Sequence, residues 1–191
     1  MQQYKIVLGS QSPRRKELLA GLGYTFTCRT TDADEIYPET LTGEQIPIFL
    51  SKLKAEALMP TLQADELLIT ADTIVWHQQQ VLGKPQDEQQ ARQMLQSLSG
   101  TTHQVITGVT LTTHTRQHSF AVNTKVTFAT LTEEEISHYI QHFKPMDKAG
   151  AYGIQEWIGY IGVEHIEGSY FNVMGLPVQR LYKELKQWLH E

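Results

Sequence analysis

The chain has 191 residues, of which 40% are hydrophobic, and its formal net charge at pH 7 is −5. This length suits one sizeable core or two small lobes, and the negative charge argues against a general nucleic-acid binder, which presents a basic surface. The sequence has no apolar run near the roughly 20 residues of a membrane span, no signal-peptide pattern at its start and a single cysteine, so we expect a cytoplasmic protein without a membrane partner.

The first predicted elements are a strand and a helix. Residues 4–8, YKIVL, form a β-branched and apolar run that predicts a strand. Ser12 suits a helix N-cap and Pro13 suits the first helical position, so a helix should follow. Arg14 and Arg15 then lie in the first turn, where the positive end of the helix dipole disfavours basic residues. A bound anion would explain the pair, and so would side chains that extend away from the helix end.

A polar, acidic loop is predicted over 28–40, followed by a second helix. Thr42 and Gln45 have the spacing of a capping box, which predicts the start of this helix at Thr42. Lys54 lies beside the apolar stripe, close to the edge of the core. The stripe itself consists of Ile46, Phe49, Leu50, Leu53 and Ala57.

Residues 67–76, LLITADTIVW, predict a buried strand that Asp72 interrupts. A short strand and turn, VLGKP, should follow at 81–85. Asp87 then suits the cap of a further helix, since it precedes an amphipathic pattern. The apolar residues of that pattern are Ala91, Met94, Leu95 and Leu98.

The second half of the sequence mixes strands and helices. The alternating segments 103–113 and 119–128 predict an antiparallel pair, and Thr132 with Glu135 forms a capping box. The stretch 147–170 is rich in glycine and aromatics, which indicates strands and tight loops. The predicted inner residues of the last two helices are Ile136, Tyr139, Ile140 and Phe143, and, after Pro177, Leu181, Leu185 and Leu189. This mixed order favours the α/β class, a mixed twisted sheet with flanking helices.

Two carboxylates are candidates for chemistry. Asp72 interrupts a strand that should be buried, so its carboxylate must meet a metal, a cation or hydrogen-bond donors, or lie at a strand end. A structural ion pair is as good an explanation as a functional site. Glu35 is a loop residue, and by itself it is best explained as a solvated charge. Together the two could bind Mg²⁺, which commonly uses one or two carboxylates and substrate phosphates.

Five basic residues lie beside special backbone positions or at the edge of the core: Arg14, Arg15, Lys54, Lys84 and Lys148. Any one lysine is best explained as a surface charge. Five from separate segments favour a cradle for a polyphosphate.

Other catalytic patterns find no support. The P-loop pattern GxxxxGK[ST] and the nucleophile elbow GxSxG are absent from the sequence. His138 and His142 have the spacing of a metal pair, but they lie opposite an apolar stripe and should be exposed to solvent. His103 is expected to be structural, and Cys28 a small, half-buried hydrophobic residue.

Seven short motifs occur in order from Ser10 to Pro177. They are S-x-S-P-R-R at 10–15, K-A at 54–55, A-D-T at 71–73, G-K-P at 83–85, S-G-x-x-H-x-V-x-T-G-V at 99–109, D-K-A-G-A-Y-G-I-Q at 147–155 and N-V-x-G-L-P at 172–177. Together they resemble the Maf family, the septum-formation-inhibitor-like nucleoside triphosphate pyrophosphatases, and the resemblance extends almost from end to end.

The resemblance implies one domain over 1–191, with two lobes around a deep nucleotide cleft, as in the similar inosine triphosphate pyrophosphatases. It implies a homodimer and a divalent metal, Mg²⁺ or Mn²⁺. The catalytic carboxylate of the family matches Asp72, and an acidic loop residue of the family matches Glu35, so these two would share the metal. The phosphate-binding positions of the family match Ser10, Arg15, Lys54 and Lys84.

The resemblance also implies a substrate. The branch that hydrolyses dTTP and UTP carries Arg14, Thr73 and Gln155 at the three positions that follow substrate preference. A glutamine amide suits the carbonyl and N–H edge of a pyrimidine, because it offers both an acceptor and a donor. Here Gln155 is followed by Glu156 and Trp157, where glycine is usual.

The expected reaction is metal-assisted attack of water on the α-phosphate, which releases pyrophosphate. A role in nucleotide-pool editing or in cell-division arrest would follow from it. The alternative is a regulator of septation that binds nucleotides without turnover. Asp72 separates the two, because a binder of a polyanion gains nothing from a carboxylate beside the phosphates unless that carboxylate recruits a metal.

Overall fold

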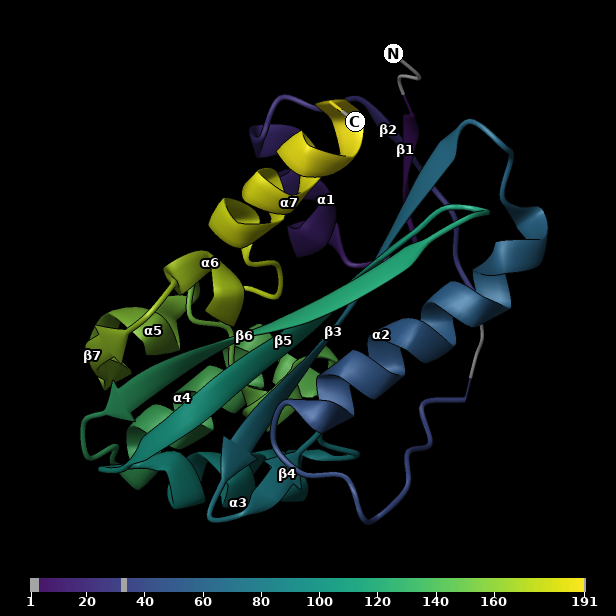
Figure 1. Cartoon of the computed structure of the whole chain (residues 1–191). Coiled ribbons are helices and arrows are strands. Elements are labelled where there is room, and N and C mark those ends of the chain that lie inside the picture. Colours follow the sequence, from purple (N-terminus) through teal and green to yellow (C-terminus); the bar gives the residue numbers. More distant parts are fainter. Residues whose placement is uncertain (1–3, 32–33, 191) are drawn as a thin grey trace. The chain divides into compact units, whose positions relative to one another are not determined.

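A computed structural model of the chain describes residues 4–31 and 34–190, apart from the side chain of His190. Strands and helices mix along these residues, as Figure 1 shows. The strands are β1 (Lys5–Leu8), β2 (Phe26–Cys28), β3 (Glu66–His77), β4 (Gln80–Leu82), β5 (Thr102–Thr112), β6 (Gln117–Phe128) and β7 (Val163–Glu167). The helices are α1 (Pro13–Gly21), α2 (Gln45–Leu58), α3 (Glu88–Leu98), α4 (Glu133–Phe143), α5 (Trp157–Gly162), α6 (Tyr170–Val173) and α7 (Val178–His190), with 3₁₀ turns at Met59–Thr61, Pro145–Asp147 and Ala149–Ala151. The predicted acidic loop includes residues 32 and 33, which lie outside the described residues.

Among the described residues, seven strands form one mixed sheet in the order β2-β1-β3-β5-β6-β7, and β4 pairs with β3. Strand β1 is parallel to both of its neighbours, with Leu8 opposite Cys28 of β2 and Ile69 of β3. Strand β4 is antiparallel to β3, and β7 is antiparallel to β6. The four residues between β5 and β6 are too few for a parallel crossover, so this neighbouring pair is antiparallel, as predicted. The α/β class with a mixed sheet and flanking helices is confirmed.

The described chain separates into two compact units. The first falls within Met1–Asp72, Thr107–Val122 and Gly175–Glu191, and the second within Thr73–Ile106 and Asn123–Met174. Strands β3, β5 and β6 therefore contribute residues to both units. No helix of the described part of the chain is both long enough and apolar enough to span a membrane.

Helix α2 of the first unit begins later than predicted. Its N-cap residue is Glu44 instead of Thr42, and no side chain caps it. Only half of the predicted capping box forms, the bond from the Thr42 N–H to Gln45 Oε1 at 3.0 Å. Gly43 has a φ of 51°, which is left-handed, so the right-handed helix cannot begin before it.

The buried face of α2 also differs from the predicted stripe. The buried residues are Ile46, Pro47, Leu50, Ser51, Ala55 and Leu58, whereas Phe49 and Leu53 are half-buried and Ala57 is exposed. The reason is close packing on β5, where the hydroxyls of Ser51 and Thr110 lie 2.8 Å apart. The buried face of α2 therefore includes the small residues Ser51 and Ala55.

The predictions for the two terminal helices are largely confirmed. Helix α1 has Ser12 as its N-cap and proline at its first position, and the Ser12 hydroxyl accepts a bond from the Arg15 N–H. Helix α7 buries Leu181 and Leu185 as expected, but it buries Trp188 in place of the half-buried Leu189. The guanidinium of Arg116 lies 3.7 Å from the centre of the Trp188 ring and covers it.

In the second unit, α4 follows its prediction except at its end. The capping box of Thr132 and Glu135 is present, and Ile136, Tyr139 and Ile140 are buried. Phe143 was predicted to face inward, but it is 37% exposed because Lys144 ends the helix in a left-handed conformation directly after it.

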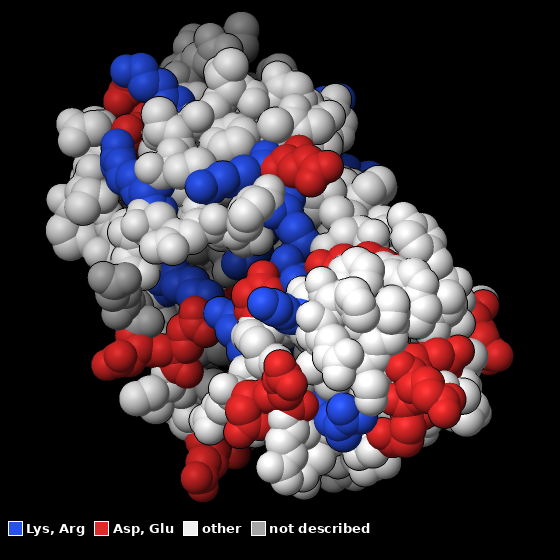
Figure 2. Space-filling view, turned by 180° about the vertical axis from the view of Figure 1, so that it is seen from behind, with Lys and Arg blue, Asp and Glu red and all other residues white. Residues whose placement is uncertain are grey.

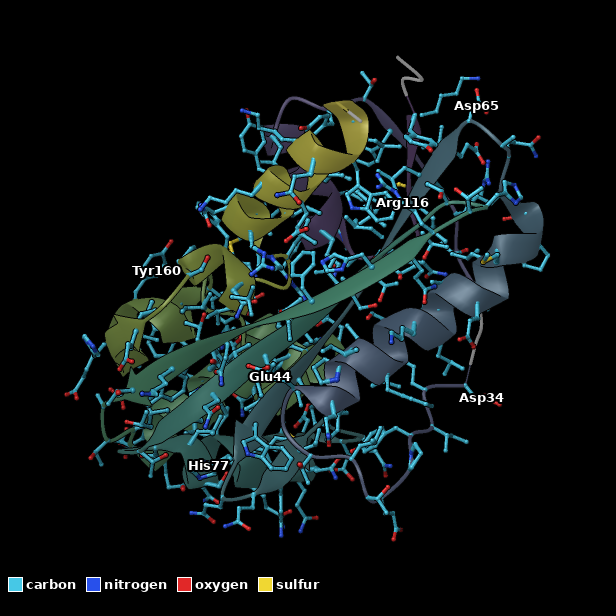
Figure 3. The ribbon with its side chains drawn as sticks, viewed as in Figure 1. Asp34, Glu44, Asp65, His77, Arg116 and Tyr160 are labelled. Carbon is cyan, nitrogen blue, oxygen red and sulfur yellow. The ribbon has the colours of Figure 1, made fainter. Side chains whose placement is uncertain are left out.

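The glycine-rich stretch 147–170 contains more helix than predicted. It forms 3₁₀ turns, then α5, and only then the predicted strand, β7. Helix α5 buries Ile158 but leaves Tyr160 pointing outward into solvent, as Figure 3 shows. Six residues with two glycines give a helical period too short to recognise, which is why this helix was missed.

His103 is structural, as predicted, and it should make stability depend on pH. It is buried in the second unit, where its Nε2 lies 2.7 Å from the Tyr152 hydroxyl, and burial lowers its pKa from 6.5 to about 3. Between these two values the unfolded chain binds a proton that the folded chain does not. The free energy of unfolding should therefore be constant above pH 6.5 and fall by about 1.4 kcal/mol per pH unit from this group as the pH drops toward 3.

Urea denaturation at several pH values would measure this slope in the wild type and in His103→Gln. The variant cannot take up a proton in this range, so its stability should fall less steeply between pH 6.5 and 3. Equal slopes in the two proteins would show that His103 is not the group responsible.

Candidate functional site

An ion-paired carboxylate marks the candidate site in the first unit. Asp72 lies on β3 and is only 6% exposed. Lys54 Nζ, from α2, lies 2.5 Å from Asp72 Oδ1 and 3.0 Å from Glu35 Oε1. Glu35 comes from the loop before α2, whose course Asp34 marks in Figure 3. The predicted need of Asp72 for a partner is thus met by a cation, and one ammonium group holds two carboxylates that are far apart in the sequence.

The topology of the sheet explains why this site forms where it does. The chain passes from β1 to β2 on one side and later to β3 on the other, so β1 and β3 flank a topological switch point. Ligands of open α/β sheets bind beyond the carboxyl ends of strands at such a point. The Gly9 N–H donates to the Ile69 carbonyl at 2.8 Å. This bond extends the pairing of β1 with β3 by one residue, up to the residue before Ser10.

Close packing at Gly9 holds the end of β1 against β3. A Cβ atom at this position would lie 2.7 Å from Thr70 Cγ2 and 2.8 Å from Leu58 Cδ1, so a larger residue would force a shift. Ser10 comes next and is buried, and its hydroxyl accepts a bond from the Ser12 N–H at 3.2 Å. Ser10 is therefore held in place at the start of α1.

Arg15 belongs to the same unit and interacts with the same carboxylates. Its Nε donates to the Gly175 carbonyl at 2.8 Å, which fixes the half-buried guanidinium. Burial lowers the pKa of Arg15, and the charges of Asp72 and Glu35 act against that decrease. Arginine stays charged throughout the physiological range, so Arg15 contributes a permanent positive charge beside two carboxylates. Arg14 is half-buried and close enough to act on the Arg15 charge.

The other predicted site residues, Thr73, Lys84 and Gln155, belong to the second unit. Thr73 is half-buried and follows Asp72 directly along β3, whereas Lys84 is exposed in the turn after β4. Gln155 follows a run of buried residues, and its Oε1 is buried with no hydrogen-bond partner among the described residues. A buried amide oxygen without a donor is uncommon in folded proteins, and this one requires an explanation.

The second unit contains another lysine held by two carboxylates, and this lysine is buried. Lys148 Nζ lies 2.8 Å from Asp147 Oδ1 and 3.1 Å from Glu156 Oε1. The sequence singled out Lys148 but not these partners, nor Tyr139, whose hydroxyl donates to the other oxygen of Glu156. Tyr139 fitted a helical stripe, so its sequence pattern indicated only a core residue. Figure 2 shows basic and acidic residues close together on one face.

The carboxylates of the first unit fit a divalent metal. Asp72 and Glu35 already converge on a single positive charge, the ammonium of Lys54. Among the described residues, no three histidine, cysteine, aspartate or glutamate side chains gather into a metal-binding group. Two carboxylates suit Mg²⁺, which takes its remaining ligands from substrate phosphates and water.

The other reactive side chains singled out in the sequence lie elsewhere. His138 and His142 are exposed as predicted, and their rings stack on each other with their centres 4.2 Å apart. Cys28 was predicted to be half-buried, but it is exposed, because it ends the short edge strand β2.

Comparisons with known proteins place the chain in a family and support its fold. The family model described as Maf-like protein matches residues 5–188. A protein of Bacteroides fragilis named dTTP/UTP pyrophosphatase is 60% identical over 98% of this chain and 97% of its own length. A protein of Phocaeicola vulgatus with the same name is 61% identical over the same shares. The solved structure of the Staphylococcus aureus Ham1 protein covers 96% of this chain and 98% of its own, at 13% identity and a TM-score of 0.51, a likeness of fold.

Proposed function

Since this chain belongs to the Maf family, we propose that it hydrolyses dTTP and UTP to the nucleoside monophosphate and pyrophosphate. Relatives of 60% and 61% identity over almost the full chain carry the name of this activity. The structural observation that carries the proposal is the buried Asp72 carboxylate, held between cationic groups at the switch point of the sheet. A carboxylate in this setting can accept a proton from water.

In the proposed reaction, Asp72 orients a water molecule and takes its proton as the oxygen attacks the α-phosphorus. Phosphoryl transfer depends on positioning and on neutralising charge at the phosphate oxygens. Lys54 and Arg15 supply fixed positive charge, and the Ser10 hydroxyl can donate a hydrogen bond. Together with Lys84, they would hold the pyrophosphate that leaves.

A divalent metal, Mg²⁺ or Mn²⁺, is part of this proposal, and Asp72 and Glu35 would hold it. When bound, it would neutralise charge on the phosphate oxygens. Lys54 now occupies the point where the two carboxylates converge, so its ammonium would turn to the phosphates when substrate binds.

Base recognition is proposed for Arg14, Thr73 and Gln155, which the resemblance assigns to substrate preference. The buried, unpartnered Oε1 of Gln155 supports its part in this role, because that oxygen can accept from a base N–H. A cytoplasmic location, a homodimer and a role in nucleotide-pool editing or cell-division arrest complete the proposal. The alternative, a regulator without turnover, is not favoured, since close relatives are named as enzymes.

Pyrophosphate release from a panel of nucleoside triphosphates tests this function. With Mg²⁺ or Mn²⁺, we expect kcat/KM for dTTP and UTP to exceed that for CTP and the purine nucleotides by about 10²-fold. A chelator should abolish release, because the phosphate charge would then lack its neutralising cation. Nucleotide binding without any release would instead support the regulator.

A further inference from the structure

A backbone hydrogen bond and a side-chain hydroxyl both close the turn that carries Gln155, which runs from Gly153 to Glu156. The Glu156 N–H donates to the Gly153 carbonyl at 2.9 Å, which is the backbone bond of a four-residue turn. The Gly153 N–H donates to the Tyr139 hydroxyl at 3.0 Å, and that hydroxyl donates to Glu156 Oε2. One buried hydroxyl thus joins the first residue of the turn to the last, with Gln155 between them.

The other carboxylate oxygen of Glu156 is bound as well. Its Oε1 lies 3.1 Å from Lys148 Nζ, which also binds Asp147. Gly153 brings these groups close together, since a Cβ atom there would lie 3.0 Å from Gln155 Nε2, Glu156 Cδ and Lys148 Cε. The absence of a side chain at Gly153 therefore lets the Gln155 amide lie over the backbone of its own turn.

The Tyr139 hydroxyl, which bonds to both ends of the turn, keeps its proton at neutral pH. Tyr139 is fully buried within the core of the second unit. Burial, and then the neighbouring Glu156 carboxylate, raise the pKa of Tyr139. The phenol is thus a lasting donor to Glu156, and the turn has a single, well-determined set of contacts.

We propose that Tyr139, Glu156 and Lys148 are positioning residues that set the base preference of the enzyme by holding the Gln155 amide oxygen ready to accept from a nucleobase N–H. The inference rests on the proposed function and deepens it. The unpartnered Oε1 is an acceptor, so the base it suits carries an imide N–H, as uracil and thymine do. Cytosine presents a ring acceptor at the same place, and two acceptors that face each other are left unpaired.

Glu156, the residue after Gln155, is central to these contacts. Glu156 accepts a hydrogen bond from Tyr139 and binds Lys148. A glycine could make neither contact. In this chain the preference for imide bases therefore depends on side chains that do not touch the base.

Removing the Tyr139 hydroxyl tests the proposal. In Tyr139→Phe the Gly153 N–H and the Glu156 carboxylate lose their shared partner, so Gln155 is no longer held. We expect the ratio of kcat/KM for UTP to that for CTP to fall by about 10²-fold. The ratio of dissociation constants for UMP and CMP, measured by calorimetry, should move in the same direction. A base-preference ratio is the readout, since a loss of stability alone would not change it.

Tyr152→Phe is the matched control. Tyr152 is also a buried tyrosine of the second unit, and its hydroxyl bonds to His103 instead of the turn. This variant should keep the wild-type ratio. Glu156→Ala should match Tyr139→Phe, and the double variant should lose no more than either single one, because both act through one turn.

A Tyr139→Phe enzyme with the wild-type ratio, or losses that add in the double variant, would overturn the proposal. Failure of the proposed function would give a different result: the wild-type protein would release no pyrophosphate from any nucleotide. In that case the UMP and CMP binding ratios still decide whether Tyr139 positions Gln155.

Discussion

Replacing Asp72 with asparagine should lower pyrophosphate release from dTTP and UTP by about 10³-fold. The amide cannot accept the proton of the attacking water, and it is a poor metal ligand in place of a carboxylate. The variant should still fold, because the asparagine oxygen can accept from Lys54 and because Glu35 still lies 3.0 Å from the ammonium. Steady-state kinetics together with thermal denaturation would measure both effects.

Glu66→Gln is the matched control for Asp72→Asn. Glu66 is a buried carboxylate on the same strand, paired with both terminal nitrogens of Arg29 at 2.5 and 2.8 Å. Its loss should reduce stability and leave kcat close to that of the wild type, since Glu66 is the first residue of β3 whereas Asp72 lies in the middle of the strand. If Asp72→Asn kept substantial turnover, or if both variants lost activity alike, the proposed role of Asp72 would be wrong.

Gly108→Ala should reduce stability strongly, with a loss of about 3 kcal/mol in the free energy of unfolding. A Cβ atom on Gly108 would lie 2.4 Å from the carbonyl carbon and oxygen of Pro47 and 2.5 Å from the Ile48 nitrogen. These are backbone atoms of α2, which cannot move aside as a side chain can. Helix α2 would have to move away from β5 and carry Lys54 with it, so activity should fall too.

Chemical denaturation of Gly108→Ala beside Gly21→Ala measures this effect. Gly21 ends α1, and a Cβ atom there meets nothing within 4 Å, so its replacement should change stability little. Equal stability of the two variants would show that α2 and β5 are not packed as closely as the structure has them.

Local chemistry explains which elements could be predicted from the sequence. Ser12 and Pro13 define the start of α1, and Thr132 with Glu135 that of α4, because each cap is made by residues within one helical turn. The start of α2 was predicted two residues too early. There the left-handed Gly43 outweighed the capping pattern, and the residue spacing does not reveal that conformation.

The sequence by itself determined that Asp72 needs a partner, since a carboxylate inside a buried strand is costly unless it is paired. Its motifs also determined the family. Only the tertiary structure decided that the partner is Lys54, shared with Glu35, and that Tyr139 and Glu156 close the turn around Gln155. The physical reason is distance along the chain. Caps and stripes join residues a few positions apart, whereas these contacts join separate segments that meet only when the strands and helices pack together.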